Sequence, residues 1–281
     1  MLDTVLSGRT MNRFVRRLAV VMALAGMAPW AHALVFAVNE GVTYRVGNDE
    51  IRGRYAVIAS DLSRLLNQPV RVEPVSEYPV LRKGLAAKSY DLALVHPAHI
   101  SIGAMKNSGY RLVAVTKGFQ EYSARFLVRA DSPIKTLADL KGRKVGAPDE
   151  DSITSWMTRA TLRDALGQAD AVAYTYTRYQ DAVPFMVEHT FTQAGATASG
   201  AVVKQWEAAG GKVLAKSRAV PIKHVIAGPA LSAEDLEKVR EYFIKLDSTE
   251  EGRKKLESIK VQGYAAFDAA ALMALGTWLG L

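Results

Sequence analysis

The 281-residue sequence contains no cysteine. This absence excludes disulfide bonds, thiolate metal sites and the lipid-bearing cysteine of a lipoprotein. The sequence also lacks a Walker loop, a Gly-x-Gly-x-x-Gly dinucleotide fingerprint, a Gly-x-Ser-x-Gly elbow and a His-Glu-x-x-His helix. We therefore expect a protein that is not an enzyme and that holds no cofactor.

The sequence has no apolar run near its N-terminus that is long enough to span a bilayer. Residues 18–28 are apolar, whereas a membrane-spanning helix needs about 20 such residues. Arginines precede this run, and Ala31-His32-Ala33 follows it as a small-x-small cleavage pattern. We predict a signal peptide over 1–33, in which 1–10 is an upstream extension if Met11 is the true start. The mature protein is then expected in the periplasm, not embedded in the membrane.

Strong charge of one sign is also lacking after this segment. The formal net charge is +8, of which residues 1–33 contribute +3, so the mature chain carries about +5. No basic run is interleaved with aromatic residues, which argues against nucleic acid as a partner. A modest positive charge suits the capture of small anions.

Apolar runs typical of strands alternate with amphipathic helical patterns, which predicts an α/β protein. The expected strands and helices of the first half are 34–39, 54–66, 70–74, 78–87 and 91–95. After Gly146 the pattern restarts, with expected elements at 154–166, 171–177, 180–188 and 198–203. Because no linker divides the halves, we predict two lobes joined by crossing strands, with lobe 1 at 34–120 and 225–281 and lobe 2 at 121–224.

The segment 131–156 is the most informative part of the chain. It is predicted to form a short helix, a Lys-Gly turn, a buried strand and a second helix that begins at the hydroxyl-rich turn around Ser152. The first N–H groups of a helix are unpaired and lie at the positive end of its dipole. This segment therefore indicates a pocket for a small oxyanion.

The same segment resembles a known family. Its Asp-Ser-Pro-Ile-x-Thr-Leu-x-Asp-Leu-Lys-Gly-x-x-Val run is similar to that of type II periplasmic solute-binding proteins. Tyr78, Asp91-Leu92-Ala93, Tyr122 and Ser152 together resemble the phosphate, phosphite and phosphonate branch of ABC transporter receptors. The resemblance implies two Rossmann-like lobes that close over a small anionic ligand, and delivery of that ligand to a membrane permease. We expect a monomer.

The resemblance also implies ligand-binding residues. The two pocket tyrosines of the family fall on Tyr78 and Tyr122, each of which can donate a phenolic hydrogen bond. The alternative is that each ring packs at an edge between the lobes without touching ligand.

The family's Ser-Thr-Ser anion cradle falls on Ser152, Ile153 and Thr154, so that an apolar side chain replaces the middle hydroxyl. Ser155 can restore a contact, and Trp156 can form a wall of the pocket. The alternative for these hydroxyls is a plain helix cap, because Ser and Thr are preferred at helix starts.

A histidine of the family falls near Gln180, which can donate a hydrogen bond but carries no positive charge. Ala198 stands where an aspartate is common, which argues against a ligand that bears an amine. His96 and His99 follow an expected strand end, where His96 is expected to contact ligand as a neutral donor. Because no third ligand has recognisable spacing, we expect no metal site.

Three functions are compatible with these residues. The preferred hypothesis is the periplasmic substrate-binding component of an ABC importer for a phosphonate-like oxyanion. A sensory subunit that presents ligand to a membrane sensor kinase or chemoreceptor would use the same fold. A periplasmic hydrolase would need Ser152 as a nucleophile and a histidine base beside it.

Overall fold

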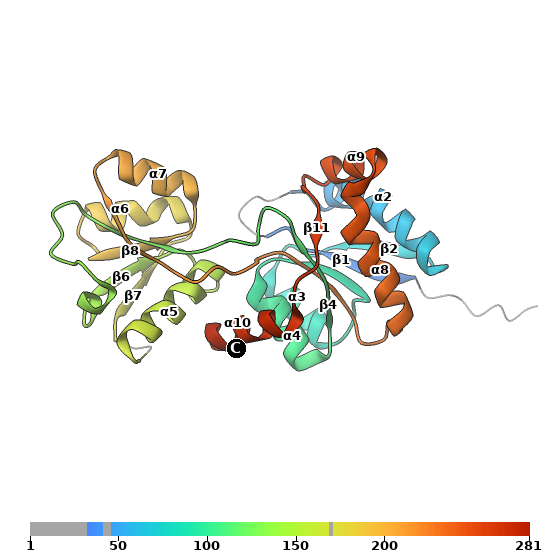
Figure 1. The fold of residues 1–281 in the computed structure, drawn as a ribbon, viewed down its shortest axis with the longest axis horizontal. Helices are drawn as coiled ribbons and strands as arrows, with labels where there is room; N and C mark the ends of the chain where they lie inside the picture. The colour runs from blue at the N-terminus through green and yellow to red at the C-terminus, as the bar shows by residue number, and fades with distance from the viewer. Residues whose placement is uncertain (1–32, 42–45, 169–170) are drawn as a thin grey trace, which may run out of the picture. The chain divides into compact units, whose positions relative to one another are not determined.

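The computed structural model describes residues 33–41, 46–168 and 171–281. The predicted signal peptide, residues 1–33, lies outside this range except for Ala33. Residues 34–281 form one compact unit that contains two β-sheets (Figure 1). No helix among the described residues is long and apolar enough to cross a membrane.

The first sheet has six strands in the order β11-β4-β10-β3-β1-β2. Their bounds are β1 Leu34–Val38, β2 Val70–Pro74, β3 Leu92–Val95, β4 Arg111–Thr116, β10 His224–Ala227 and β11 Tyr264–Ala265. Strand β1 pairs in parallel with β2 and β3, whereas β10 runs antiparallel between β3 and β4. Strands β1 and β3 are continuous apolar runs, as expected for strands that are buried on both faces, whereas β2 at the edge of the sheet alternates apolar residues with Arg71 and Glu73.

Helices cover both faces of this sheet. Their bounds are α2 Asn48–Leu66, α3 Tyr78–Ala86, α4 Ala98–Ser108, α8 Ala233–Lys245, α9 Glu250–Ser258 and α10 Ala269–Leu279. Along β1, Phe36 and Val38 pack with α2, α8 and α9, while Ala37 between them packs with α3, α4 and α10. This alternation follows from the two-residue repeat of a strand and yields the doubly wound layers seen in Figure 1.

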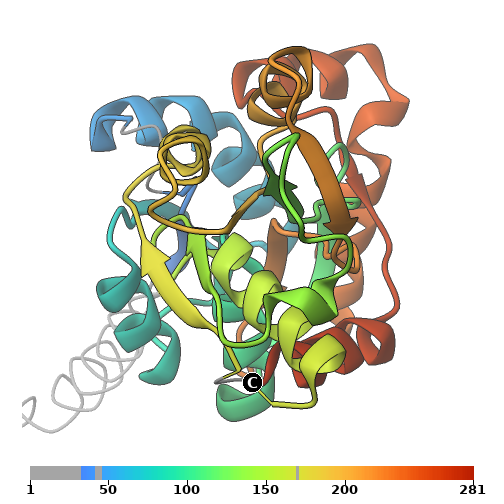
Figure 2. The same cartoon turned by 90° about the vertical axis from the view of Figure 1, so that its left-hand side faces the viewer.

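The second sheet has five strands in the order β7-β6-β8-β5-β9. Its elements are β5 Arg125–Val128, β6 Lys144–Ala147, α5 Ile153–Leu166, β7 Ala173–Tyr176, α6 Val183–Glu188, β8 Ala194–Thr197, α7 Gly200–Ala208 and β9 Lys212–Lys216. Phe126 packs with α5, and its neighbour Leu127 packs with α6 and α7 on the opposite face. Figure 2 turns this sheet toward the viewer, with α5 in light green.

Two crossing segments join the sheets. The chain leaves the first sheet after β4 and returns to it between β9 and β10. The segments run antiparallel, because Val220 donates a backbone hydrogen bond to Tyr122 at 2.8 Å and Ile222 donates one to Phe119 at 3.1 Å. The predicted class of two α/β sheets joined by crossing strands is confirmed.

One predicted element is wrong. The strand expected at 198–203 lies earlier, at β8, and Ser199 instead caps helix α7 by accepting a hydrogen bond from the N–H of Val202. The strand is built from small residues, because a Cβ atom on Gly195 would come within 2.6 Å of the Val183 side chain on α6. Because α6 packs closely on this strand, the strand lacks the β-branched residues by which strands are usually recognised in a sequence.

Candidate ligand-binding site

The candidate site begins at the first turn of α5. Ser152 caps this helix, since its Oγ accepts a hydrogen bond from the N–H of Ser155 at 3.1 Å. The Ser152 hydroxyl then donates to the Ser155 Oγ at 3.1 Å, and the Ser155 hydroxyl donates to the Pro148 carbonyl at 2.9 Å. Both serine hydroxyls are thus used inside the turn, and no histidine is hydrogen-bonded to Ser152 among the described residues.

The main chain of the same turn offers free donors. The N–H groups of Ile153 and Thr154 have no hydrogen-bond partner among the residues that the structure describes. The Ile153 side chain is buried in the apolar core, so this residue can serve a ligand only through its N–H. Two N–H groups at the positive end of a 14-residue helix are suited to bind an oxyanion.

Tyr122 and Gln180 lie next to this turn. The Tyr122 hydroxyl is 3.4 Å from the Thr154 Oγ1 and accepts a hydrogen bond from the Gln180 Nε2 at 2.8 Å. The Gln180 Oε1 accepts hydrogen bonds from the Ala198 N–H at 2.5 Å and the Thr197 hydroxyl at 3.1 Å. Gln180 therefore orients Tyr122 so that the phenolic proton is available to an acceptor.

Tyr78 and Trp156 lie against the apolar cluster that also contacts the ring of Tyr122. Tyr78 is the first residue of α3, and Trp156 lies in the first turns of α5. The Trp156 indole stacks on the His99 ring, with 5.1 Å between ring centroids and an interplanar angle of 22°. The stacked rings of Trp156 and His99 therefore lie beside the first turn of α5.

An ion pair that the sequence did not reveal connects α3 of the first sheet with the turn before α5 of the second, beside the stacked rings. Asp151, which precedes Ser152, accepts two hydrogen bonds of 2.7 Å from the Arg82 guanidinium on α3. The His99 Nε2 is 3.2 Å from the Asp151 carboxylate and 3.1 Å from Arg82. Burial opposes ionisation of Asp151, but the bonds from His99 and Arg82 outweigh it and hold the pKa of Asp151 well below its usual range.

The sequence indicates a position near the site for each partner separately, but not the pair. Arg82 lies four residues after Tyr78, so that both side chains share one face of the helix. Asp151 is adjacent to the predicted helix cap Ser152. Nothing in the sequence indicates that these two segments meet.

His96 follows β3, as predicted, but in another role. Its Nδ1 is 3.1 Å from the Ile222 carbonyl, which can only accept, so the ring proton is on Nδ1. Burial, together with the nearby charge of Lys223, lowers the pKa of His96 to about 4. The neutral ring therefore presents Nε2 as an acceptor, whereas the sequence suggested a donor to an anion.

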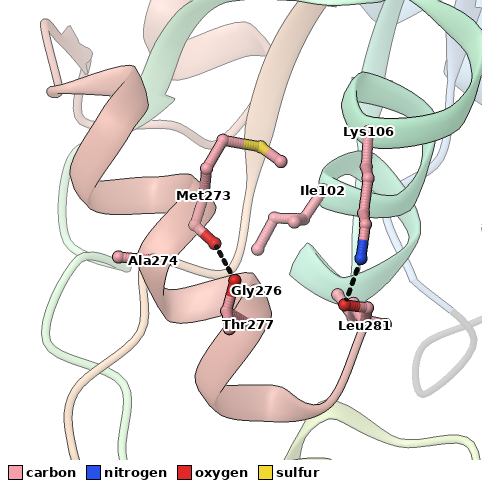
Figure 3. Close-up of a pocket in the computed structure, with 7 residues that line it drawn as sticks. All are labelled: Ile102, Lys106, Met273, Ala274, Gly276, Thr277 and Leu281. Atoms are coloured by element: carbon pink, nitrogen blue, oxygen red, sulfur yellow. Dashed lines mark hydrogen bonds between the residues drawn. The ribbon is translucent and has the colours of Figure 1, made fainter.

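A separate hollow lies between α4 and α10, away from these residues (Figure 3). It measures about 170 Å³ and is lined by Ile102, Lys106, Met273, Ala274, Gly276, Thr277 and Leu281. The Lys106 ammonium donates a hydrogen bond to the Leu281 carbonyl at 2.6 Å across it. This contact anchors the C-terminal residue to α4.

The two sheets and the crossing segments have the type II fold of periplasmic binding proteins. The model of the periplasmic substrate-binding proteins of phosphonate ABC transporters matches residues 41–272. The chain belongs to this family. It is the substrate-binding component of an ABC transporter system and not an enzyme.

Solved structures show the same fold at low sequence identity. PhnD1 from Prochlorococcus marinus, solved with methylphosphonate, is 15% identical over 87% of this chain and 96% of its own, with a TM-score of 0.60. XAC2383 from Xanthomonas citri, solved with ATP, is 13% identical over 88% of this chain and 97% of its own, with a TM-score of 0.70. A binding protein of a phosphonate transporter from Pseudomonas aeruginosa is 17% identical over 88% of this chain and 85% of its own, with a TM-score of 0.56. No curated protein matches the sequence.

Proposed function

We propose that the protein binds a phosphonate or a similar small oxyanion between the first turn of α5 and Tyr122. The main support is the pair of free N–H groups at Ile153 and Thr154, which lie next to a phenol that Gln180 orients. The neighbour from P. marinus was solved with methylphosphonate, which makes this compound the first ligand to test. Tyr78 is assigned to the opposite wall of the site, on α3.

Two lobes are proposed to close over the ligand. Lobe 1 consists of residues 34–120 and 225–281, and lobe 2 consists of residues 121–224. The crossing segments around Tyr122 and Val220 are the proposed hinge, because they connect the sheets by few backbone hydrogen bonds. We further propose export by the predicted signal peptide, its cleavage after Ala33, and transfer of ligand by the mature monomer to a membrane permease. Size-exclusion chromatography and N-terminal sequencing of the exported protein test these points.

Calorimetric titration of the purified protein with methylphosphonate, phosphate, sulfate and acetate tests the proposed function. We expect methylphosphonate to bind and acetate not to bind, because the site offers several donors to a tetrahedral oxyanion. A protein that binds none of the tetrahedral anions would contradict the proposal.

Tyr122→Phe tests whether the Tyr122 hydroxyl binds the ligand, because this variant removes the hydroxyl and keeps the ring. We expect about a tenfold loss of affinity for methylphosphonate, which corresponds to one hydrogen bond to a charged group. Tyr179→Phe is the control, since Tyr179 is exposed on the surface. Equal affinities of the two variants would remove Tyr122 from the site.

A further inference from the structure

Lys223 is a half-buried cation without a carboxylate partner. Its ammonium lies 4.3 Å from the centroid of the Phe119 ring, and it forms no salt bridge among the described residues. Burial lowers the pKa of Lys223, while the charge of Glu40 raises it. An ammonium held at an aromatic face is stabilised in part and can still bind an anion.

Lys223 lies at the edge of the first sheet where open α/β folds bind their ligands. The next residue, His224, is the first of β10 and pairs with Val95, the last residue of β3. The preceding residue, Ile222, contacts the His96 ring through its carbonyl. The crossing segment that carries Lys223 is paired with the one that carries Tyr122.

Two carboxylates around the site, Glu40 and Asp151, are already neutralised by arginines. Glu40 is bound by Arg54 at 2.7 Å and accepts a hydrogen bond from the Tyr55 hydroxyl at 3.1 Å. Asp151 is bound by Arg82. Lys223 therefore leaves this group of charged residues with one uncompensated positive charge.

The end of β8 does not supply a negative charge either. Ala198 presents a methyl group, and its N–H is already bound to Gln180. An amine on the ligand would thus meet an ammonium at the first sheet and find no free carboxylate among the residues named above. A second acidic group would meet a partner.

Resting on the proposed function, we propose that Lys223 binds a second acidic group of the ligand. The phosphonyl group occupies the first turn of α5, and the second group, a carboxylate or another phosphonate, reaches the ammonium on the side of the first sheet. The substrate class is therefore a phosphonate with an additional acidic group, and aminoalkylphosphonates are disfavoured.

Calorimetric titration with three ligands tests this proposal: methylphosphonate, phosphonoacetate and 2-aminoethylphosphonate. We expect phosphonoacetate to bind about tenfold more tightly than methylphosphonate, as for one charge-assisted hydrogen bond, and 2-aminoethylphosphonate to bind more weakly. Lys223→Met should abolish the preference for phosphonoacetate and change the affinity for methylphosphonate by less than about threefold. Lys223→Arg should keep the preference.

Lys204→Met is the control, because Lys204 is exposed on α7. Unfolding temperatures of the ligand-free variants establish that each one folds, and Lys223→Gln replaces Lys223→Met if the latter does not. The proposal is overturned if the wild type does not prefer phosphonoacetate, or if Lys223→Met weakens both ligands equally. If the wild type binds no phosphonate at all, the proposed function fails first, which is a distinct result.

Discussion

Two substitutions of Gln180 separate the effect of its hydrogen bonds on stability from the effect of an added negative charge on ligand binding. In Gln180→Leu, the Ala198 N–H and the Thr197 hydroxyl both lose their acceptor. Thr197 is fully buried, and an unsatisfied buried donor costs about 1 kcal/mol or more. We expect a total loss of about 2 kcal/mol, which lowers the unfolding temperature by about 4 to 8 °C for a chain of this size.

Gln180→Glu is the contrasting variant. The carboxylate still accepts both hydrogen bonds, so the unfolding temperature should stay close to that of the wild type. The Tyr122 hydroxyl then donates to the carboxylate at position 180, and its proton is no longer available to a ligand. Together with the added negative charge, this should weaken methylphosphonate binding by at least about tenfold.

Differential scanning calorimetry and titration calorimetry of the two variants give both measurements. The hydrogen bonds of Gln180 both stabilise the fold and orient Tyr122 only if Gln180→Leu loses stability and Gln180→Glu loses affinity for methylphosphonate. An unchanged unfolding temperature of Gln180→Leu would show that Gln180 does not support the end of β8. Unchanged affinity of Gln180→Glu would place the ligand away from Tyr122.

Two further predictions concern packing and charge. A double-mutant cycle of Arg82→Gln and Asp151→Asn should give a coupling of about 1 kcal/mol in thermal unfolding at low salt, the upper end for a partly exposed pair; zero coupling would refute it. Because the pKa of Asp151 is lowered, this contribution exists above the usual value of about 3.9, should still be present at pH 5, and is lost in stronger acid as the folded-state group protonates. Gly276→Ala should cost about 1 to 3 kcal/mol, because its Cβ would lie 2.4 Å from the Ile102 side chain, whereas Gly103→Ala, with open space, should stabilise its helix. Equal unfolding temperatures of the two alanine variants would contradict that packing.

The sequence predicted those elements whose burial is visible in their composition. The predicted strands at 34–39 and 91–95 contain β1 and β3, which are apolar throughout because both faces are buried. The predicted strand at 70–74 is β2, an edge strand in which Arg71 and Glu73 alternate with Val70 and Val72. The strand β8 was missed because close packing of α6 requires small residues there, and small residues carry no strand signal. The pattern of apolar residues therefore predicts which faces of strands and helices are buried, but not how closely a helix packs on a strand.

The site was predictable only where its geometry is local. Ser152 caps α5 through a residue three positions away, and such spacing is visible in the sequence. Gln180 and Tyr122 are 58 positions apart, so nothing along the chain shows that the amide orients the phenol. The proton position on His96 likewise depends on the Ile222 carbonyl, 126 positions away.

Asp151 raises a physical difficulty that its partners resolve. A carboxylate one residue before an anion-binding helix start repels the anion and reduces the benefit of the dipole. The two hydrogen bonds from Arg82 compensate this charge, but Arg82 belongs to α3 beside the first sheet, whereas Asp151 precedes α5 of the second. Compensation therefore requires that the two elements remain in contact. If the lobes separate and the anion binds where we propose, the unpaired carboxylate lies next to it, so opening itself should weaken binding and favour release.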